Sequence, residues 1–228
     1  MRLLWSPKIL RQKLRILWVG NKNMVKIKIC GITNLEDALY AARLGADALG
    51  FIFYKHSPRY INPEEALSII RKLPKHIKKV GVFVNAREIN IKRIARNLKL
   101  DMLQFHGNES DEFCARFGNF KVIKAFRVQK KISCADLYKY DVWAYLFDAF
   151  VGDRFGGTGK KIDLNLLEGI KDLKKIIFLS GGLSPEYVRR ALLVFPAQWV
   201  DASSSLERSP GKKDPTKIKR FISNAKGY

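Results

Sequence analysis

A cysteine ends a short apolar stretch near the start of the chain. Residues 26–30 read Lys-Ile-Lys-Ile-Cys, and Gly31 follows at once. Because side chains alternate between the two faces of a β-strand, Lys28 and Cys30 are predicted to share one face. A thiol at a strand tip, with a lysine two residues below it, suits acid–base or nucleophilic chemistry. The alternative is a buried thiol that only packs, since free cysteine is among the most buried residue types.

Three other reactive or charged side chains follow apolar stretches in the same way. Asp148 ends the stretch 143–148. Opposite a thiol it would form half of an acid–base pair, and otherwise it caps a helix or joins a salt bridge. Arg59 lies in a loop with a fixed proline and can bind a carboxylate in bidentate fashion. His106 follows 102–105 and either contacts a ligand or fills a core or capping position.

Glycine- or serine-rich segments follow the last three apolar stretches. They are residues 156–160 (Gly-Gly-Thr-Gly-Lys), 180–183 (Ser-Gly-Gly-Leu) and 201–205 (Asp-Ala-Ser-Ser-Ser). Glycine allows backbone N–H groups to turn toward an anion, and a helix N-terminus adds partial positive charge. One Gly-Gly pair is ordinary in a turn, but three such segments together predict a phosphate site.

Short apolar stretches with strand character alternate with longer amphipathic stretches along the chain. The predicted strands cover residues 26–30, 46–53, 79–84, 102–105, 121–126, 143–148, 176–179 and 198–201. The predicted helices cover residues 35–44, 63–72, 88–98, 110–117, 134–139, 163–170, 185–193 and 215–224. This α/β alternation predicts a parallel sheet, and its eightfold count favours a closed (β/α)8 TIM barrel over an open sheet. Chemistry then belongs on the loops that follow the strands.

The composition suits one folded domain with a dispersed positive charge. The chain has 228 residues, 47% of them hydrophobic, and a formal net charge of +22. Such a charge fits nucleic acid or anionic small molecules, but mixed runs of lysine and aspartate and the lack of an arginine–aromatic motif favour scattered surface charge. We therefore expect neither a nucleic-acid nor a membrane partner.

The spacing of the cysteines and the length of the apolar runs indicate where in the cell the protein works. Cys30, Cys114 and Cys134 are widely spaced and have no neighbouring histidine set, which argues against a disulfide framework and against a zinc or other metal site. No apolar run approaches the roughly 20 residues that span a bilayer. Both features predict a cytoplasmic protein.

Residues 1–23 differ from the rest of the chain. They carry six basic residues and no acidic one, and basic residues interrupt their apolar part. A secretory signal would need a continuous apolar region. A basic amphipathic membrane-binding or transit helix is one alternative. We expect instead that 1–23 lies outside the folded unit and that the barrel domain comprises residues 24–228.

Together these segments resemble the phosphoribosylanthranilate isomerase family of tryptophan biosynthesis. The resemblance runs essentially from Met24 to the C-terminus. It rests on seven motifs: Lys28–Thr33 (KICGIT), 57–59 (SPR), 104–107 (QFHG), 147–148 (FD), 156–159 (GGTG), 180–183 (SGGL) and 201–204 (DASS). It implies a single (β/α)8 barrel with no metal and no organic cofactor, acting as a monomer or homodimer on a phosphorylated small molecule.

The resemblance also implies a reaction and a role for each site residue. The reaction is an Amadori rearrangement of N-(5-phosphoribosyl)anthranilate by general acid–base catalysis. Cys30 matches the general base, Asp148 the general acid, and Arg59 the residue that faces the anthranilate carboxylate. The remaining substrate-binding positions, most of them in the phosphate cradle, are His106, Gly157, Gly159, Gly181, Gly182, Asp201, Ser203 and Ser204.

Two features of the site are left open by the resemblance. A thiol with an ordinary pKa is mostly protonated at pH 7, so a base role calls for a nearby positive charge, and Lys28 is the candidate. The last segment departs from the family pattern at two positions: Ala202 replaces the usual valine, and Ser205 replaces the usual glycine. A serine at position 205 could change the turn that orients Ser203 and Ser204.

Two other classes of protein are alternatives to this family. Another phosphate-binding barrel is one, but an indole-glycerol-phosphate synthase would use a lysine and glutamates, and a histidine-pathway sugar isomerase paired aspartates. Cys30 with Asp148 fits neither. A basic nucleic-acid-binding protein is the other, and in it the strand-end glycines would be mere turns.

Overall fold

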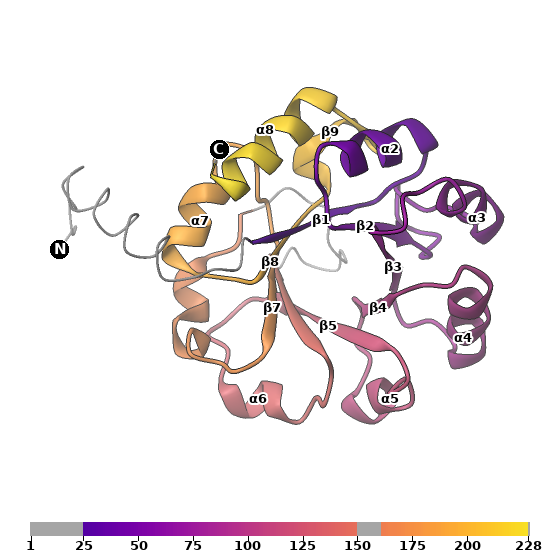
Figure 1. The fold of residues 1–228 in the computed structure, drawn as a ribbon. Helices are drawn as coiled ribbons and strands as arrows, with labels where there is room; N and C mark the ends of the chain where they lie inside the picture. The colour runs from indigo at the N-terminus through magenta and orange to yellow at the C-terminus, as the bar shows by residue number, and fades with distance from the viewer. Residues whose placement is uncertain (1–24, 150–160, 228) are drawn as a thin grey trace.

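Eight parallel strands close into a barrel, which confirms the predicted fold class (Figure 1). The computed structural model describes residues 25–149 and 161–227. The strands, in order around the barrel, are β1 (Lys26–Cys30), β2 (Ala48–Ile52), β3 (Lys78–Phe83), β4 (Met102–Phe105), β5 (Lys121–Val128), β6 (Ala144–Ala149), β7 (Ile176–Leu179) and β8 (Trp199–Ala202). The N-terminal segment 1–23 and the glycine-rich segment 156–160 lie outside the described residues, so the predictions for them stay predictions.

Helices surround the barrel as a ring in Figure 1. They are α2 (Leu35–Arg43), α3 (Pro63–Ile70), α4 (Glu88–Asn97), α5 (Asp111–Ala115), α6 (Cys134–Tyr138), α7 (Val188–Val194) and α8 (Pro215–Lys226), with 3₁₀ segments η1 (Leu164–Ile170) and η2 (Ser204–Leu206). Side-chain caps explain several starts: Asn34 Oδ1 accepts from Asp37 N at 2.9 Å, and Asn62 Oδ1 from Glu65 N at 2.8 Å. The predicted start at Pro185 was three residues early, because a turn precedes α7.

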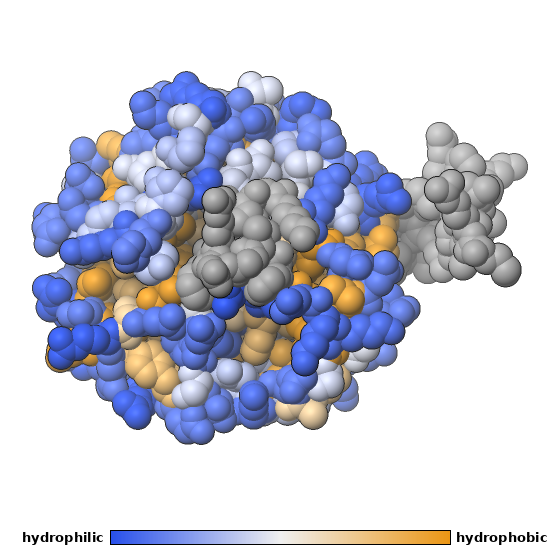
Figure 2. All heavy atoms as spheres, turned by 180° about the vertical axis from the view of Figure 1, so that it is seen from behind, coloured by the Kyte–Doolittle hydropathy of each residue, from blue (hydrophilic) through white to orange (hydrophobic). Residues whose placement is uncertain are grey.

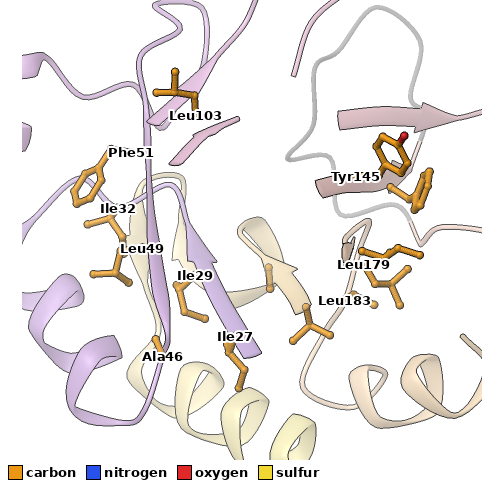
Figure 3. Packing of buried hydrophobic residues seen from close by; sticks show 14 of the residues in the cluster. Ile27, Ile29, Ile32, Ala46, Leu49, Phe51, Leu103, Tyr145, Leu179 and Leu183 are labelled. Carbon is orange, nitrogen blue, oxygen red and sulfur yellow. The ribbon is translucent and has the colours of Figure 1, made fainter. Parts of the chain in front are cut away.

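The two faces of the strands build two separate hydrophobic clusters. The barrel interior holds the smaller cluster, made of Ala48, Val80, Met102, Ile123, Ala125, Ala144, Leu146, Phe178 and Trp199. Residues of opposite parity, among them Ile27, Ile29 and Leu49, belong to the larger cluster that also includes helix residues (Figure 3). The predicted shared parity of Asp148 with Ala144 and Leu146 therefore places the Asp148 side chain on the interior side of β6.

A small hairpin that the sequence did not predict lies between β8 and α8. It pairs β9 (Glu207–Ser209) with β10 (Lys212–Lys213) in antiparallel fashion. The Thr33 hydroxyl, in the loop after β1, donates a hydrogen bond to the Gly211 carbonyl. Gly211 has a φ of 79°, which suits glycine at the hairpin tip. The hairpin thus joins the loop after β8 to the loop after β1.

Hydrophilic side chains dominate the face of the molecule drawn in Figure 2, with hydrophobic ones between them. In the described part of the chain, no helix is long and apolar enough to cross a membrane.

The cap of α8 offers a test of how firmly the last helix holds the barrel. Asp214 Oδ1 accepts hydrogen bonds from Thr216 N at 2.9 Å and Lys217 N at 3.1 Å. We expect Asp214→Ala to lower the free energy of unfolding by about 1 kcal/mol, measured by urea denaturation. Asp141→Ala is the matched control, because Asp141 is fully exposed and its contact with Lys175 is a long one, at 3.8 Å. Equal effects of the two substitutions would contradict the capping role.

Candidate active site

Cys30 ends β1 and lies opposite a glycine on β2. Its side chain is buried, and its register partner on β2 is Gly50. A Cβ atom at Gly50 would lie 2.7 Å from Cys30 Sγ and 3.1 Å from Lys28 Nζ. Only glycine therefore leaves room for both groups. Gly50 was not predicted as a site residue, although a glycine inside a predicted strand is a signal of close approach.

Lys28 forms a buried ion pair directly below the thiol. Its Nζ lies 2.9 Å from Asp201 Oδ1 on β8, and the two side chains are 0% and 5% exposed. Burial by itself would lower the pKa of Lys28, but the Asp201 carboxylate and Cys30 raise it above the ordinary value. Lys28 is therefore cationic. Asp201, predicted as a substrate-binding residue, has Lys28 as its partner within the protein.

The thiol itself is held in its protonated form. Burial raises the pKa of Cys30, and the Asp201 carboxylate acts in the same direction. Lys28 and, more weakly, Lys213 lower it, but the pKa of Cys30 stays above its ordinary value. Lys28 thus acts in the predicted direction without outweighing burial.

Asp148 and His106 form a hydrogen-bonded pair at the ends of β6 and β4. His106 Nε2 lies 3.2 Å from Asp148 Oδ2, and Asp148 Oδ1 accepts from Ala149 N at 2.9 Å. The other ring nitrogen, Nδ1, lies 2.8 Å from Nε2 of Gln104. All three side chains of this row are buried. His106 is therefore neither isolated nor a cap, and Gln104 joins the site although only its motif was noted in the sequence.

Arg59 already binds a carboxylate in the bidentate manner that its residue type predicted. Its Nε and Nη2 donate to the two carboxylate oxygens of Glu207 at 2.8 and 2.7 Å. Glu207 also accepts from Lys213 Nζ at 2.9 Å. Burial would raise the pKa of Glu207, but Arg59 and Lys213 together hold it below the ordinary range. The sequence did not predict the roles of Glu207 and Lys213. Arg59, the partner of Glu207, is remote in sequence, and the contact between Glu207 and Lys213 exists only once the hairpin has formed.

Gly31 brings the arginine and a serine together next to Cys30. A Cβ atom at Gly31 would lie 2.8 Å from Arg59 Cδ and 2.9 Å from Ser203 Oγ. The residue also has a φ of 74°, a left-handed conformation that favours glycine. The turn after β1 therefore places Cys30, Arg59 and Ser203 around one point.

Segments 180–183 and 201–205, both predicted to bind phosphate, lie close together. Ser205 Oγ donates to Leu183 O at 2.5 Å, so the serine that departs from the family pattern links segment 201–205 to segment 180–183. Gly181 lies against the end of β6, since a Cβ atom there would come within 2.7 Å of Ala149 N. Within the described residues, the buried Ser203 Oγ has no hydrogen-bond partner. A buried hydroxyl without a partner is suited to bind a ligand oxygen.

The remaining predicted residues of the phosphate site have these positions. Gly182 follows Gly181 with a φ of 62°, and Ser204 begins η2. Gly157 and Gly159 lie outside the described residues. Across residues 25–149 and 161–227, no three His, Cys, Asp or Glu side chains gather in the way that a metal ion would need.

Comparison with known proteins identifies the family. The model of a family described as N-(5′phosphoribosyl)anthranilate (PRA) isomerase matches residues 27–224. The chain belongs to this family. An N-(5′-phosphoribosyl)anthranilate isomerase from Citrifermentans bemidjiense is 48% identical over 203 residues, covering 89% of this chain and 98% of that protein.

Solved structures of phosphoribosylanthranilate isomerases are similar to this chain in both sequence and fold. The enzyme from Thermotoga maritima is 44% identical, with a TM-score of 0.84 over 90% of this chain and all of that one (100%). A phosphoribosylanthranilate isomerase in complex with reduced 1-(o-carboxyphenylamino)-1-deoxyribulose 5-phosphate is 43% identical, with a TM-score of 0.81 and the same coverage. The chain is thus an isomerase of tryptophan biosynthesis, which sets aside the other phosphate-binding barrels and the nucleic-acid-binding protein considered above.

The charge below the thiol can be tested by titration. Because Lys28 lowers the pKa of Cys30, we expect Lys28→Met to raise that pKa further above its ordinary value. Thiolate absorbance at 240 nm against pH measures it, as the difference from the same protein with Cys30→Ala. Lys28→Met combined with Asp201→Asn avoids an unpaired buried carboxylate and should keep part of the rise.

Lys78→Met is the control for the removal of a lysine charge. Lys78 is half-exposed and lies 3.7 Å from Asp101 at the other end of the barrel strands. Its loss should leave the Cys30 titration unchanged. A thiol pKa that stays the same or falls in Lys28→Met would exclude Lys28 as the stabilising charge.

Proposed function

We propose that Cys30 is the general base and Asp148 the general acid with which this chain isomerises N-(5′-phosphoribosyl)anthranilate. The observation that carries this proposal is the placement of both groups. They lie buried at the C-terminal ends of β1 and β6 in one closed barrel, the end at which TIM-barrel enzymes carry out their chemistry. Each also has its own set of polar neighbours, Lys28 for Cys30 and His106 for Asp148.

The acid acts first. Asp148 donates its proton to the furanose ring oxygen, the bond from C1′ to that oxygen breaks, and the nitrogen lone pair forms a protonated Schiff base. The hydrogen bonds from His106 and from Ala149 N stabilise the carboxylate that remains on Asp148. The positive charge of the proton has then moved to the substrate nitrogen.

The base acts second. The Cys30 thiolate removes the proton from C2′, and the electron pair neutralises the Schiff base to give an enolamine. Transfer of the enol proton to C1′ then yields 1-(2-carboxyphenylamino)-1-deoxyribulose 5-phosphate. Burial keeps the free thiol protonated, so the thiolate has to be favoured by Lys28 and by the cationic Schiff base together.

The rest of the site binds the two anionic ends of the substrate. Glu207 fixes the plane of the Arg59 guanidinium through Nε and Nη2, which leaves Nη1 for the anthranilate carboxylate. Ser203, Ser204 and the backbone of Gly181 and Gly182 bind the phosphate, with Gly157 and Gly159 completing the cradle. His106 contributes by its hydrogen bond to Asp148, and Asp201 by its ion pair with Lys28. The unpartnered Ser203 Oγ supports this assignment within the described residues.

Removal of either proton-transfer group should nearly abolish turnover. We expect Cys30→Ala and Asp148→Asn each to lower kcat by about 10²- to 10⁴-fold, followed by the loss of anthranilate fluorescence. Cys134→Ala and Asp172→Asn are the matched controls, since they remove the same group types outside the site. If both site variants stay folded and turn over at near wild-type rates, the assigned mechanism is wrong.

The folded unit comprises residues 24–228 and works in the cytoplasm as a monomer or homodimer. A chain that begins at Met24 should therefore match the full chain in kcat/KM and in its urea midpoint. The physical reason is that β1 and its partners β2 and β8 are complete from Lys26 onward. A loss of turnover or a lower midpoint in the shortened chain would assign residues 1–23 to the folded unit.

A further inference from the structure

One buried amide in the barrel interior has no role in the mechanism so far. Gln104 lies on β4 and is 1% exposed. Its register partners on the neighbouring strands are Val82 and Ile123, both apolar and buried. A buried amide among apolar side chains is costly unless its hydrogen bonds are made. The position therefore calls for a polar task.

Only one end of this amide is used. Its NH2 group lies 2.8 Å from Nδ1 of His106, while Oε1 is buried and has no hydrogen-bond partner among the described residues. An amide that served only to fill space would gain nothing from this arrangement. The contact that it does make is the one with the imidazole ring.

That contact decides which ring nitrogen carries the proton. An amide NH2 group is only a donor, so Nδ1 has to be the acceptor, and the proton of a neutral imidazole then lies on Nε2. Nε2 in turn lies 3.2 Å from Asp148 Oδ2. The donor is thus aimed at the carboxylate. The other tautomer would direct a bare nitrogen at the same oxygen.

We propose that Gln104 is a positioning residue that fixes His106 as the Nε2–H tautomer and thereby directs a hydrogen bond onto Asp148 as that carboxyl group loses its proton. This inference rests on the proposed role of Asp148 as the acid. No bond in the protein is made or broken by Gln104. It selects the ring nitrogen from which the developing carboxylate is stabilised.

The tautomer can be measured directly in the free protein. The chain has only three histidines, so ¹⁵N NMR with His56→Gln and His76→Gln identifies the His106 ring. We expect a protonated Nε2 and a bare Nδ1 at neutral pH. Gln104→Met, which removes the donor at similar size, should give a mixture of tautomers. Gln104→Glu, which keeps the shape and in its ionised form can only accept, should place a proton on Nδ1. A protonated Nδ1 in the unaltered protein would overturn the proposal.

Turnover tests the path through Asp148. We expect Gln104→Met to lower kcat about 10- to 100-fold with KM little changed, the size of one hydrogen bond to a charged group. In an Asp148→Asn background the same substitution should cause no further loss. Equal losses with and without Asp148 would overturn the proposal and indicate a packing role.

The two hypotheses fail in different ways. If Asp148→Asn alone retains turnover, the acid assignment is wrong, whatever the tautomer of His106. If Asp148→Asn is inactive but the NMR spectrum of the unaltered protein shows Nδ1–H, the role of Gln104 is wrong and the acid assignment stands.

Discussion

The buried ion pair between Lys28 and Asp201 lies where the barrel closes. These residues are register partners on β1 and β8, the first and last strands, and their charged atoms are 2.9 Å apart. Loss of one member of such a pair leaves an unpaired charge in the interior, which costs about 3–5 kcal/mol. Among the groups that lower the pKa of Cys30, the same lysine has the largest effect. Closure of the barrel and the electrostatics of the thiol therefore depend on one contact.

The hairpin after β8 brings a second group of buried charged side chains together. Glu207 of β9 binds Arg59 and Lys213, and Lys213 N donates to Asp37 Oδ2 at 2.8 Å. The hairpin is thus joined to the loop after β2 through Arg59 and to α2 through Asp37, by buried polar contacts. An arginine with its plane fixed in advance loses less conformational freedom when it meets a substrate carboxylate, so these contacts favour recognition as well as stability.

Local residue patterns were sufficient to predict the barrel and most of the strand-end groups. The strands 26–30, 102–105 and 176–179 agree residue for residue, because buried parallel strands are short, apolar and bounded by turns. The partners of the site residues could not be predicted. Arg59 was expected to meet a ligand carboxylate, but Glu207, 148 positions away, meets it first. The hairpin was missed for the same reason, since its fixing contact to Asp37 spans 176 positions.

The net charge of +22 explains less of the anion binding than its size suggests. Inside the fold, most of this positive charge is paired: Lys28 with Asp201, Lys124 with Glu109 at 2.8 Å, and Arg59 and Lys213 with the single carboxylate of Glu207 that they share. Charges exposed to water attract a ligand only weakly at physiological salt. The phosphate site proposed above accordingly relies on neutral donors, among them the Ser203 hydroxyl, which has no hydrogen-bond partner among the described residues. Neutral donors also avoid adding further cations next to Lys28, so the binding of phosphate and the ionisation of Cys30 can be set separately.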